Sequence, residues 1–312
     1  MPGILRNLVR RAANAIAARL PVYVTFHVRP KQANNIRNWR DDPSLPAARI
    51  AFVIQGPFWK PDDFTLETVR LYRTHCPGAA VIVSTWEDED PALVERAREA
   101  GAEVILNRKP KDGGLWNIKY QITSAHAGLS RAKALGYEHA LKTRTDTRMY
   151  APDIDRFFLA AVQRFPIRDG GDQRARIFGF DLGTVKHRLY GISDMHVFGH
   201  VDDLLVYYSL DVDDRYDVTA SGDDAVVPES YLAARFLGAV GVTPAWTQDD
   251  SDRFIATRFC ILDHAMVDLF WTKYNVFRER RYVLYDTAEP RHAFMTFRDW
   301  LILHDRHQAA PR

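Results

Sequence analysis

A short polar stretch at the end of an apolar run holds the residues best suited to chemistry. Lys142, Arg144 and Asp146 alternate there within five residues. Ammonium and guanidinium groups neutralise phosphate oxygens, and a carboxylate can anchor a divalent cation such as Mn²⁺ or Mg²⁺ that does the same. We therefore expect Arg144 to contact a diphosphate with help from Lys142, and Asp146 to be the metal ligand if a cation takes part. The alternative is a plain salt bridge between Arg144 and Asp146.

Two further carboxylates are candidates for proton transfer. Glu229 follows Pro228 in what reads as the first turn of a helix through Leu237, where the helix dipole favours an ionised carboxylate that can act as a base. Asp194 precedes the apolar run 196–199 and could bind or deprotonate a hydroxyl group. Each has a structural alternative, because acidic residues stabilise helix starts and cap turns. We rank Glu229 first as the base and Asp194 second.

The candidates for binding the donor are polar and turn residues, which either end or follow the first predicted strands or lie on the predicted helix over 116–135. A glycine after a strand lets the backbone approach a base or ribose, and amides four residues apart on a helix share a face suited to a pyrimidine edge. A plain turn and a solvated helix face are the alternatives. The expected donor-binding residues are Gln55, Gly56, Pro57, Thr85, Asn117, Gln121 and Arg144.

The elements that must position these residues alternate regularly. Apolar runs predict strands over 49–54, 80–86, 103–107 and 138–144, and helical spacing predicts helices over 62–75, 91–100 and 116–135. Alternating strands and helices indicate an α/β fold with a mainly parallel central sheet flanked by helices. Ligands of such sheets bind at the carboxyl ends of the strands, where Gln55, Thr85 and Asp146 would all lie.

Composition excludes several classes of protein. The 312 residues are 46% hydrophobic, which is enough for a large core. The 42 basic and 40 acidic residues nearly cancel, so the net positive charge is too small for a dedicated nucleic-acid binder. Two cysteines without a metal-finger spacing indicate neither a disulfide framework nor a structural zinc site. The sequence contains no apolar run long enough to span a bilayer and no secretory signal, which predicts a cytoplasmic protein.

The chain is expected to fall into three parts. Residues 1–47 form a basic amphipathic helix over 4–20 and a polar connector, and this helix either lies on the anionic inner face of the membrane or docks on its own domain. Residues 48–285 form one catalytic domain, with a donor half over 48–150 and an acceptor half over 151–285. Residues 286–312 form a C-terminal tail.

Five motifs in the expected order resemble the WavE-type lipopolysaccharide-synthesis family over roughly residues 48 to 280. They begin at Val53, Ser84, Asn117, Lys142 and Ser193, and a sixth piece begins at Pro228. The resemblance implies a GT-A-like nucleotide-sugar-binding fold and a glycosyltransferase, of hexosyltransferase type, that acts in bacterial surface-glycan assembly. Where GT-A enzymes commonly carry Asp-x-Asp, this chain has Arg144 in place of the first carboxylate, which puts the dependence on a metal in question.

The expected reaction is the transfer of a sugar from a nucleotide-sugar donor to an oligosaccharide or lipid-linked glycan of lipopolysaccharide or capsule. Two alternatives stay open. A sugar nucleotidyltransferase would carry a glycine- and lysine-rich phosphate loop after the first strand, which the run from Gln55 to Pro57 does not provide. A catalytically silent glycan- or nucleotide-binding protein on the same fold agrees with the missing carboxylate at Arg144.

Overall fold

The structure, a computed structural model, describes residues 3–19, 28–36, 48–168, 171–211, 227–273 and 294–309. The chain divides into two units, residues 1–37 and residues 38–312. The smaller unit contains α1 (Gly3–Ala17) and the short helix η1 (Ala33–Asn35). The helix expected over 4–20 is thus present, although Leu20 lies outside the described residues.

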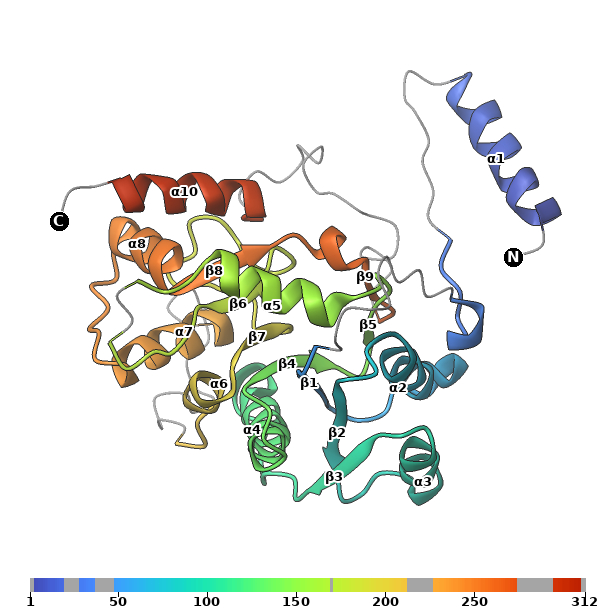
Figure 1. Cartoon of the computed structure of the whole chain (residues 1–312), viewed down its shortest axis with the longest axis horizontal. Helices are drawn as coiled ribbons and strands as arrows, with labels where there is room; N and C mark the ends of the chain where they lie inside the picture. Colours follow the sequence, from blue (N-terminus) through green and yellow to red (C-terminus); the bar gives the residue numbers. More distant parts are fainter. Residues whose placement is uncertain are drawn as a thin grey trace. The chain divides into compact units, whose positions relative to one another are not determined.

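A seven-stranded sheet forms the centre of the larger unit (Figure 1). The strand order is β3-β2-β1-β4-β7-β6-β8, and β7 alone among them runs antiparallel to its neighbours β4 and β6. The strands are β1 (Ala51–Gln55), β2 (Ala80–Trp86), β3 (Glu103–Asn107), β4 (His139–Arg144), β6 (Ile177–Phe180), β7 (Val197–His200) and β8 (Phe259–Leu262). The predicted α/β fold with a mainly parallel sheet is confirmed.

Helices cover both faces of this sheet. In Figure 1, α2 and α3 lie on one side of β1, β2 and β3, and α4 lies on the other. The strands β1, β2 and β3 are added toward one edge of the sheet, whereas β4 is added on the other side of β1. Right-handed crossovers then require that the helix before β4 covers the opposite face. The helices of the larger unit are α2 (Phe64–His75), α3 (Pro91–Glu99), α4 (Ile118–Ala134), α5 (Ile154–Arg164), α6 (Val201–Tyr207), α7 (Pro228–Ala239), α8 (Gln248–Arg258) and α10 (Phe297–Ala309). The described residues also include the short helices η2 (Pro61–Asp63), η3 (Leu115–Asn117) and η5 (His264–Val267).

A small second sheet lies beside the end of β4. It pairs β5 (Thr147–Met149) antiparallel with β9 (Leu269–Trp271), so that Thr147 is opposite Trp271. Only Thr145 and Asp146 separate β4 from β5 along the chain. The second sheet therefore brings a segment from the far end of the sequence to the polar stretch after β4.

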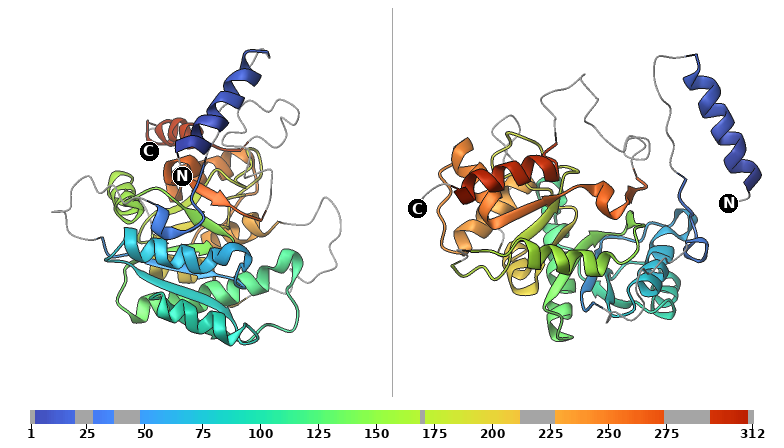
Figure 2. Two further views of the ribbon diagram at one scale, coloured as in Figure 1. Left: turned by 90° about the vertical axis from the view of Figure 1, so that its right-hand side faces the viewer. Right: turned by 45° about the horizontal axis from the view of Figure 1, so that its top comes forward.

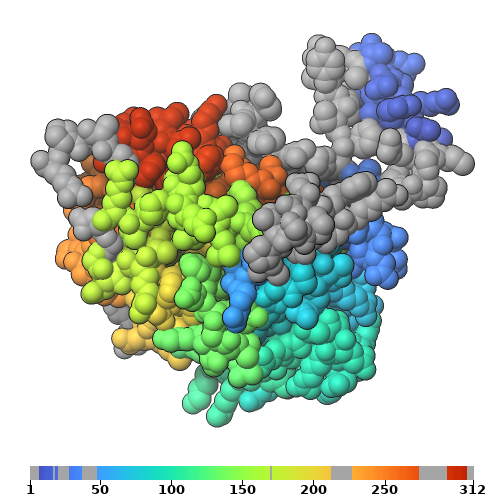
Figure 3. Space-filling view, in the orientation of Figure 1, coloured from blue at the N-terminus to red at the C-terminus, as the bar shows by residue number. Residues whose placement is uncertain are grey.

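The C-terminal segment differs from the expected tail. Helix α10 packs along α8 and β8, and both Figure 2 and the space-filling view in Figure 3 show it on the larger unit. Trp300 is completely buried, and its indole N–H donates to the carbonyl oxygens of Ile255 and Phe259 at 3.1 and 3.0 Å. Residues 294–309 therefore complete the core, while the boundary expected at residue 285 lies outside the described residues.

Close contact between α4 and the sheet depends on one glycine. Strand β1 is buried along its whole length, and α4 lies across β1 and β2 with Gly128 facing Val53 and Ser84. A Cβ atom at position 128 would overlap Val53 Cγ1 and come within 3.3 Å of Ser84 Cβ. Any larger residue would push α4, which carries Gln121, away from the ends of the strands.

We predict opposite effects for two helical glycines. Gly128→Ala should destabilise the protein by about 1–3 kcal/mol, because overpacking outweighs the gain in helix propensity. Gly238→Ala in α7 is the matched control, since a Cβ there meets no atom within 4 Å, and it should stabilise by up to about 1 kcal/mol. Urea unfolding of both variants checks this. Equal effects of the two substitutions would contradict the close packing of α4 on β1.

Candidate functional site

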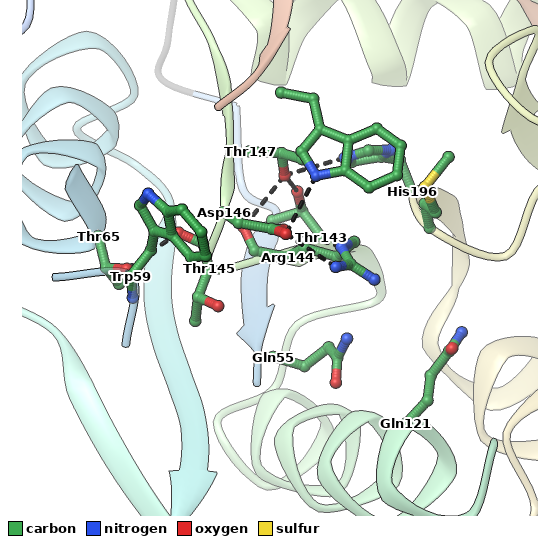
Figure 4. A network of polar contacts seen from close by, with 12 residues as sticks. Gln55, Trp59, Thr65, Gln121, Thr143, Arg144, Thr145, Asp146, Thr147 and His196 are labelled. Atoms are coloured by element: carbon green, nitrogen blue, oxygen red, sulfur yellow. Dashed lines mark hydrogen bonds and ion pairs between the residues drawn. The ribbon is translucent and has the colours of Figure 1, made fainter. Parts of the chain in front are cut away.

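A partly buried ion pair forms at the end of β4. Arg144 Nε donates to Asp146 Oδ1 and Arg144 Nη2 donates to Asp146 Oδ2, both at 2.8 Å, which is bidentate geometry. The indole N–H of Trp271, from β9, donates to Asp146 Oδ2 at 3.0 Å. Figure 4 shows Asp146 between Arg144 and Thr147 at the centre of the polar network. The second sheet therefore supplies one of the three donors that hold this carboxylate.

The surroundings keep Asp146 ionised. Burial acts to raise the pKa of its carboxyl group, but the hydrogen bonds and the positive charge of Arg144, together with the Trp271 indole, outweigh burial and hold the pKa below its usual value. The guanidinium of Arg144 lies 5.4 Å from the centre of the Trp271 ring. Because the Arg144 side chain is still 25% exposed, this oriented cation can be reached from solvent.

Hydroxyl groups and one histidine fill the space behind the ion pair. Thr147 Oγ1 donates to the carbonyl oxygen of Arg144 at 3.1 Å and lies 2.9 Å from His196 Nε2. Burial and the positive charges of Lys142 and Arg144 hold the pKa of His196 well below its usual value, so the imidazole is neutral. His196 Nδ1 is buried and has no hydrogen-bond partner among the described residues.

Lys142 does not supplement Arg144 as expected from the sequence. It is completely buried, and its ammonium group donates to the carbonyl oxygen of Asp194 at 2.7 Å. Burial lowers the pKa of Lys142 to about 7. Its position on β4 directs it into the core next to β7, so it holds the protein backbone instead of a ligand.

Three donors from separate elements meet at the carbonyl oxygen of Asp194. Besides Lys142, the Tyr208 hydroxyl donates to it at 2.9 Å and Gln121 Nε2 donates at 3.2 Å. Gln121 Nε2 also lies 2.9 Å from the Asp194 carboxylate oxygen Oδ2. The backbone and side chain of Asp194 are therefore fixed by β4, α4 and the residue after α6.

Glu229 lies close enough to Asp194 for the two charges to interact. Helix α7 begins at Pro228, as the sequence predicts, which puts Glu229 in its first turn. Burial and the negative charge of Asp194 raise the pKa of Glu229 to about 7. The expectation that the helix dipole keeps Glu229 ionised is therefore corrected: with a pKa of about 7, this carboxyl group is only partly ionised near pH 7. Arg188, whose Nη1 is 3.8 Å from Glu229 Oε1, opposes the shift.

The other expected donor-binding residues are only partly brought together. Gln55, at the end of β1, accepts a hydrogen bond from Ser124 Oγ at 2.7 Å, and Figure 4 shows it on the same side of the strand end as Arg144 and Gln121. Gly56 is buried, has φ of +112°, and would place a Cβ 3.3 Å from Thr145 Oγ1, so a glycine is needed there.

Three of the expected residues are placed differently. Pro57 is exposed. Thr85 is buried and its hydroxyl donates to Glu89 Oε2 at 3.2 Å, which ties the end of β2 to the start of α3. Asn117 does not share a helical face with Gln121, because α4 begins at Ile118 and Asn117 caps it in the left-handed conformation with φ of +63°. Its side chain is exposed.

The donor set at Asp146 does not fit a resident divalent cation in this arrangement. Both carboxylate oxygens already accept hydrogen bonds, and a cation bound to them would be repelled by the Arg144 guanidinium beside it. Across the described parts of the chain, no three His, Cys, Asp or Glu residues lie together in a way that could hold a metal ion.

Sequence reasoning missed a second polar pair on the same rim. Asp181 comes directly after β6, and His264 comes shortly after β8. Both carboxylate oxygens of Asp181 lie within 2.9 Å of His264 Nδ1. Since β6 and β8 are parallel, their carboxyl ends meet at one edge. A carboxylate directly after an apolar strand is the same signal that identified Asp146, and it would have identified Asp181.

These features define an α/β domain with a mainly parallel central sheet and a polar rim at the carboxyl ends of its strands. Residues 50–236, more than half of the chain, match the family described as WavE lipopolysaccharide synthesis. The chain therefore belongs to the WavE lipopolysaccharide synthesis family, which confirms the resemblance seen in the motifs.

Structural comparison finds nucleotide-sugar and nucleotidyl transferases at low similarity. A protein described as a glucose-1-phosphate thymidylyltransferase from Bacillus anthracis has 10% identity, covers 63% of this chain and 85% of its own, and gives a TM-score of 0.35. A nucleotide-diphospho-sugar transferase from Desulfovibrio desulfuricans has 11% identity, coverage of 63% and 77%, and a TM-score of 0.34. The 4-diphosphocytidyl-2C-methyl-D-erythritol synthase of Anaerococcus prevotii has 12% identity, coverage of 66% and 96%, and a TM-score of 0.36. No curated protein matches the sequence.

We predict that Asp194→Asn lowers the pKa of Glu229. The substitution removes the negative charge while an amide oxygen can still accept from Gln121, so the pKa should fall but stay above its ordinary value, because burial is the larger cause. A ¹³C NMR titration of the glutamate carboxyl groups, assigned with Glu229→Gln, measures the change. Asp202→Asn on α6 is the control and should leave the Glu229 midpoint unmoved. A midpoint that Asp194→Asn does not shift would show that the two carboxyl groups do not interact.

Proposed function

We propose that this protein transfers a sugar from a nucleotide-sugar donor to a growing bacterial surface glycan, either a lipopolysaccharide core or a capsule oligosaccharide. One observation carries the proposal. At the carboxyl rim of the sheet, a bidentate ion pair with Asp146 orients the partly exposed guanidinium of Arg144. In the second half of the same domain, burial and the negative charge of Asp194 raise the pKa of Glu229 to about 7, which suits a base. Membership of a lipopolysaccharide synthesis family agrees with this substrate class.

Arg144 would receive the diphosphate of the donor. A guanidinium presents a fork of N–H groups that matches phosphate oxygens, and pairing with Asp146 fixes its direction before the donor binds. As the bond between the sugar and the diphosphate breaks, negative charge grows on the leaving oxygen, and a fixed cation stabilises it without reorganisation. Gln55 and Gln121, on the same side of the strand end, offer amide groups to the remainder of the donor.

Glu229 would accept the proton of the incoming hydroxyl group. The acceptor oxygen attacks the anomeric carbon, the nucleoside diphosphate leaves with the bonding electron pair, and the hydroxyl proton moves to the carboxylate. A base with a pKa of about 7 is well matched to this task near neutral pH. Asp194, held by three donors, would keep the pKa of Glu229 raised and orient the acceptor.

Donor binding should survive removal of metal and depend on Arg144. Nucleotide sugars tested as a panel in a chelator should give thermal stabilisation and slow donor hydrolysis with the wild type. Arg144→Ala should weaken binding roughly 10- to 100-fold, because charge-assisted hydrogen bonds are lost, and Asp146→Ala should weaken it by releasing Arg144.

Arg98→Ala is the control, since Arg98 forms an exposed ion pair with Glu95 on α3. Absence of binding for every donor would contradict the enzyme function. Binding without any hydrolysis or transfer would instead favour a silent binding protein, and binding only with Mn²⁺ or Mg²⁺ would contradict the role of Arg144.

The rate of transfer should follow the ionisation of Glu229. Because the base must be deprotonated, kcat should fall as pH drops through about 7. Glu229→Gln should lower kcat by about 10²- to 10⁴-fold above pH 7 and abolish this pH dependence, so that the difference from the wild type shrinks at lower pH. Initial rates from pH 5.5 to 8.5 provide the measurement. Glu95→Gln on the surface of α3 is the matched control and should leave the profile unchanged. A Glu229→Gln variant with wild-type rates would exclude Glu229 as the base.

A further inference from the structure

The net positive charge of this chain lies in its N-terminal segment. Residues 1–40 contain eight Lys and Arg residues and no Asp or Glu, while the remainder contains 34 basic and 40 acidic residues. The nearly neutral total therefore conceals a strongly cationic N-terminal segment and an anionic remainder. A segment of this kind is attracted to an anionic surface that the rest of the chain repels.

Helix α1 adds an apolar face to this charge. It spans Gly3–Ala17 and contains no acidic residue. Its large apolar side chains Leu8 and Ile16 are 64% and 48% exposed, and helical spacing puts them on one face. Arg10 lies on the opposite face and is exposed.

The combination fits a lipid surface better than other polyanions. An acidic protein patch or a nucleic acid would take the arginines but gives no reason for exposed Leu8 and Ile16. A bilayer takes both, because apolar side chains enter the boundary of the acyl chains while arginines contact anionic headgroups. Fifteen residues extend about 22 Å as a helix, which is short of the about 30 Å hydrocarbon core. No helix among the described residues is long and apolar enough to cross a membrane.

We propose that α1 lies in the headgroup region of an anionic bilayer, with Leu8 and Ile16 toward the acyl chains and Arg10 and Arg11 at the headgroups. This inference concerns the smaller unit and does not depend on the chemistry of the site at β4. The acceptor of the proposed reaction, where it is lipid-linked, would be found on the same surface.

Vesicle co-sedimentation of the full-length chain tests the proposal. Vesicles of neutral phosphatidylcholine are compared with vesicles that also contain phosphatidylglycerol. We expect binding to the anionic vesicles, little to the neutral ones, and a decrease with added salt. Arg10→Gln with Arg11→Gln should weaken binding about 30-fold, since each basic residue near the surface contributes about fivefold. Leu8→Asp with Ile16→Asp should weaken it at least about tenfold.

Matched control substitutions are available on α10. Leu301 and Ile302 are 40% and 58% exposed, and Arg298 is also exposed. The double variant Leu301→Asp with Ile302→Asp is the control for the apolar substitutions in α1. The single variant Arg298→Gln is the control for the arginine substitutions. They should leave binding unchanged. Thermal unfolding checks that every variant stays folded, and hydrolysis of a nucleotide sugar in the absence of vesicles separates this test from that of the proposed function.

Three results would overturn the proposal. Equal binding to neutral and anionic vesicles would exclude the electrostatic contribution. Anionic binding that the α1 substitutions do not weaken would assign it to another surface. Binding of α1 to single- or double-stranded nucleic acid, with no binding to vesicles, would identify a different partner.

Discussion

The carboxylate of Asp146 is the point on which the rest of the site depends. This carboxylate is buried and accepts two hydrogen bonds from Arg144 and one from Trp271. The backbone carbonyl oxygen of Asp146 accepts a further hydrogen bond from the Thr272 N–H at 3.1 Å. A buried charge is stable only when it is paired and hydrogen-bonded, so removing any partner would leave an expensive unsatisfied group. The Arg144–Asp146 pair therefore connects the central sheet to the β5-β9 sheet. It also fixes the direction of the Arg144 guanidinium, which is the more exposed of the two groups.

The two halves of the domain meet next to this pair. Antiparallel β7 lies against β4, and Lys142 from β4 donates across that junction to the Asp194 carbonyl group. The carboxyl pair in the second half is thereby held in a constant relation to Arg144 in the first half. Its negative charge is largely shielded from water, which is why the pKa of Glu229 is raised to about 7.

The sequence predicted the parallel strands well because β1, β2 and β4 are buried apolar runs bounded by turn residues. It also singled out Arg144, Asp146, Gln121 and Asp194 as candidates, because polar residues that follow or face buried strands are recognisable. The structure pairs Arg144 with Asp146 and Gln121 with Asp194, and their role in binding or catalysis stays a prediction. It could not supply Trp271, which lies 125 residues from Asp146 along the chain. The raised pKa of Glu229 and the left-handed conformation at Asn117 depend on burial and local packing, which no local pattern encodes.

Calorimetric titration in a chelator with nucleoside diphosphates and the matching monophosphates tests the central claim most directly. If Arg144 receives the diphosphate, the wild type will bind the diphosphate more tightly than the monophosphate of the same nucleoside, and Arg144→Gln will lose that preference while it still binds the monophosphate. A preference that is unchanged in Arg144→Gln, or one that arises only after Mn²⁺ or Mg²⁺ is added, would contradict the account.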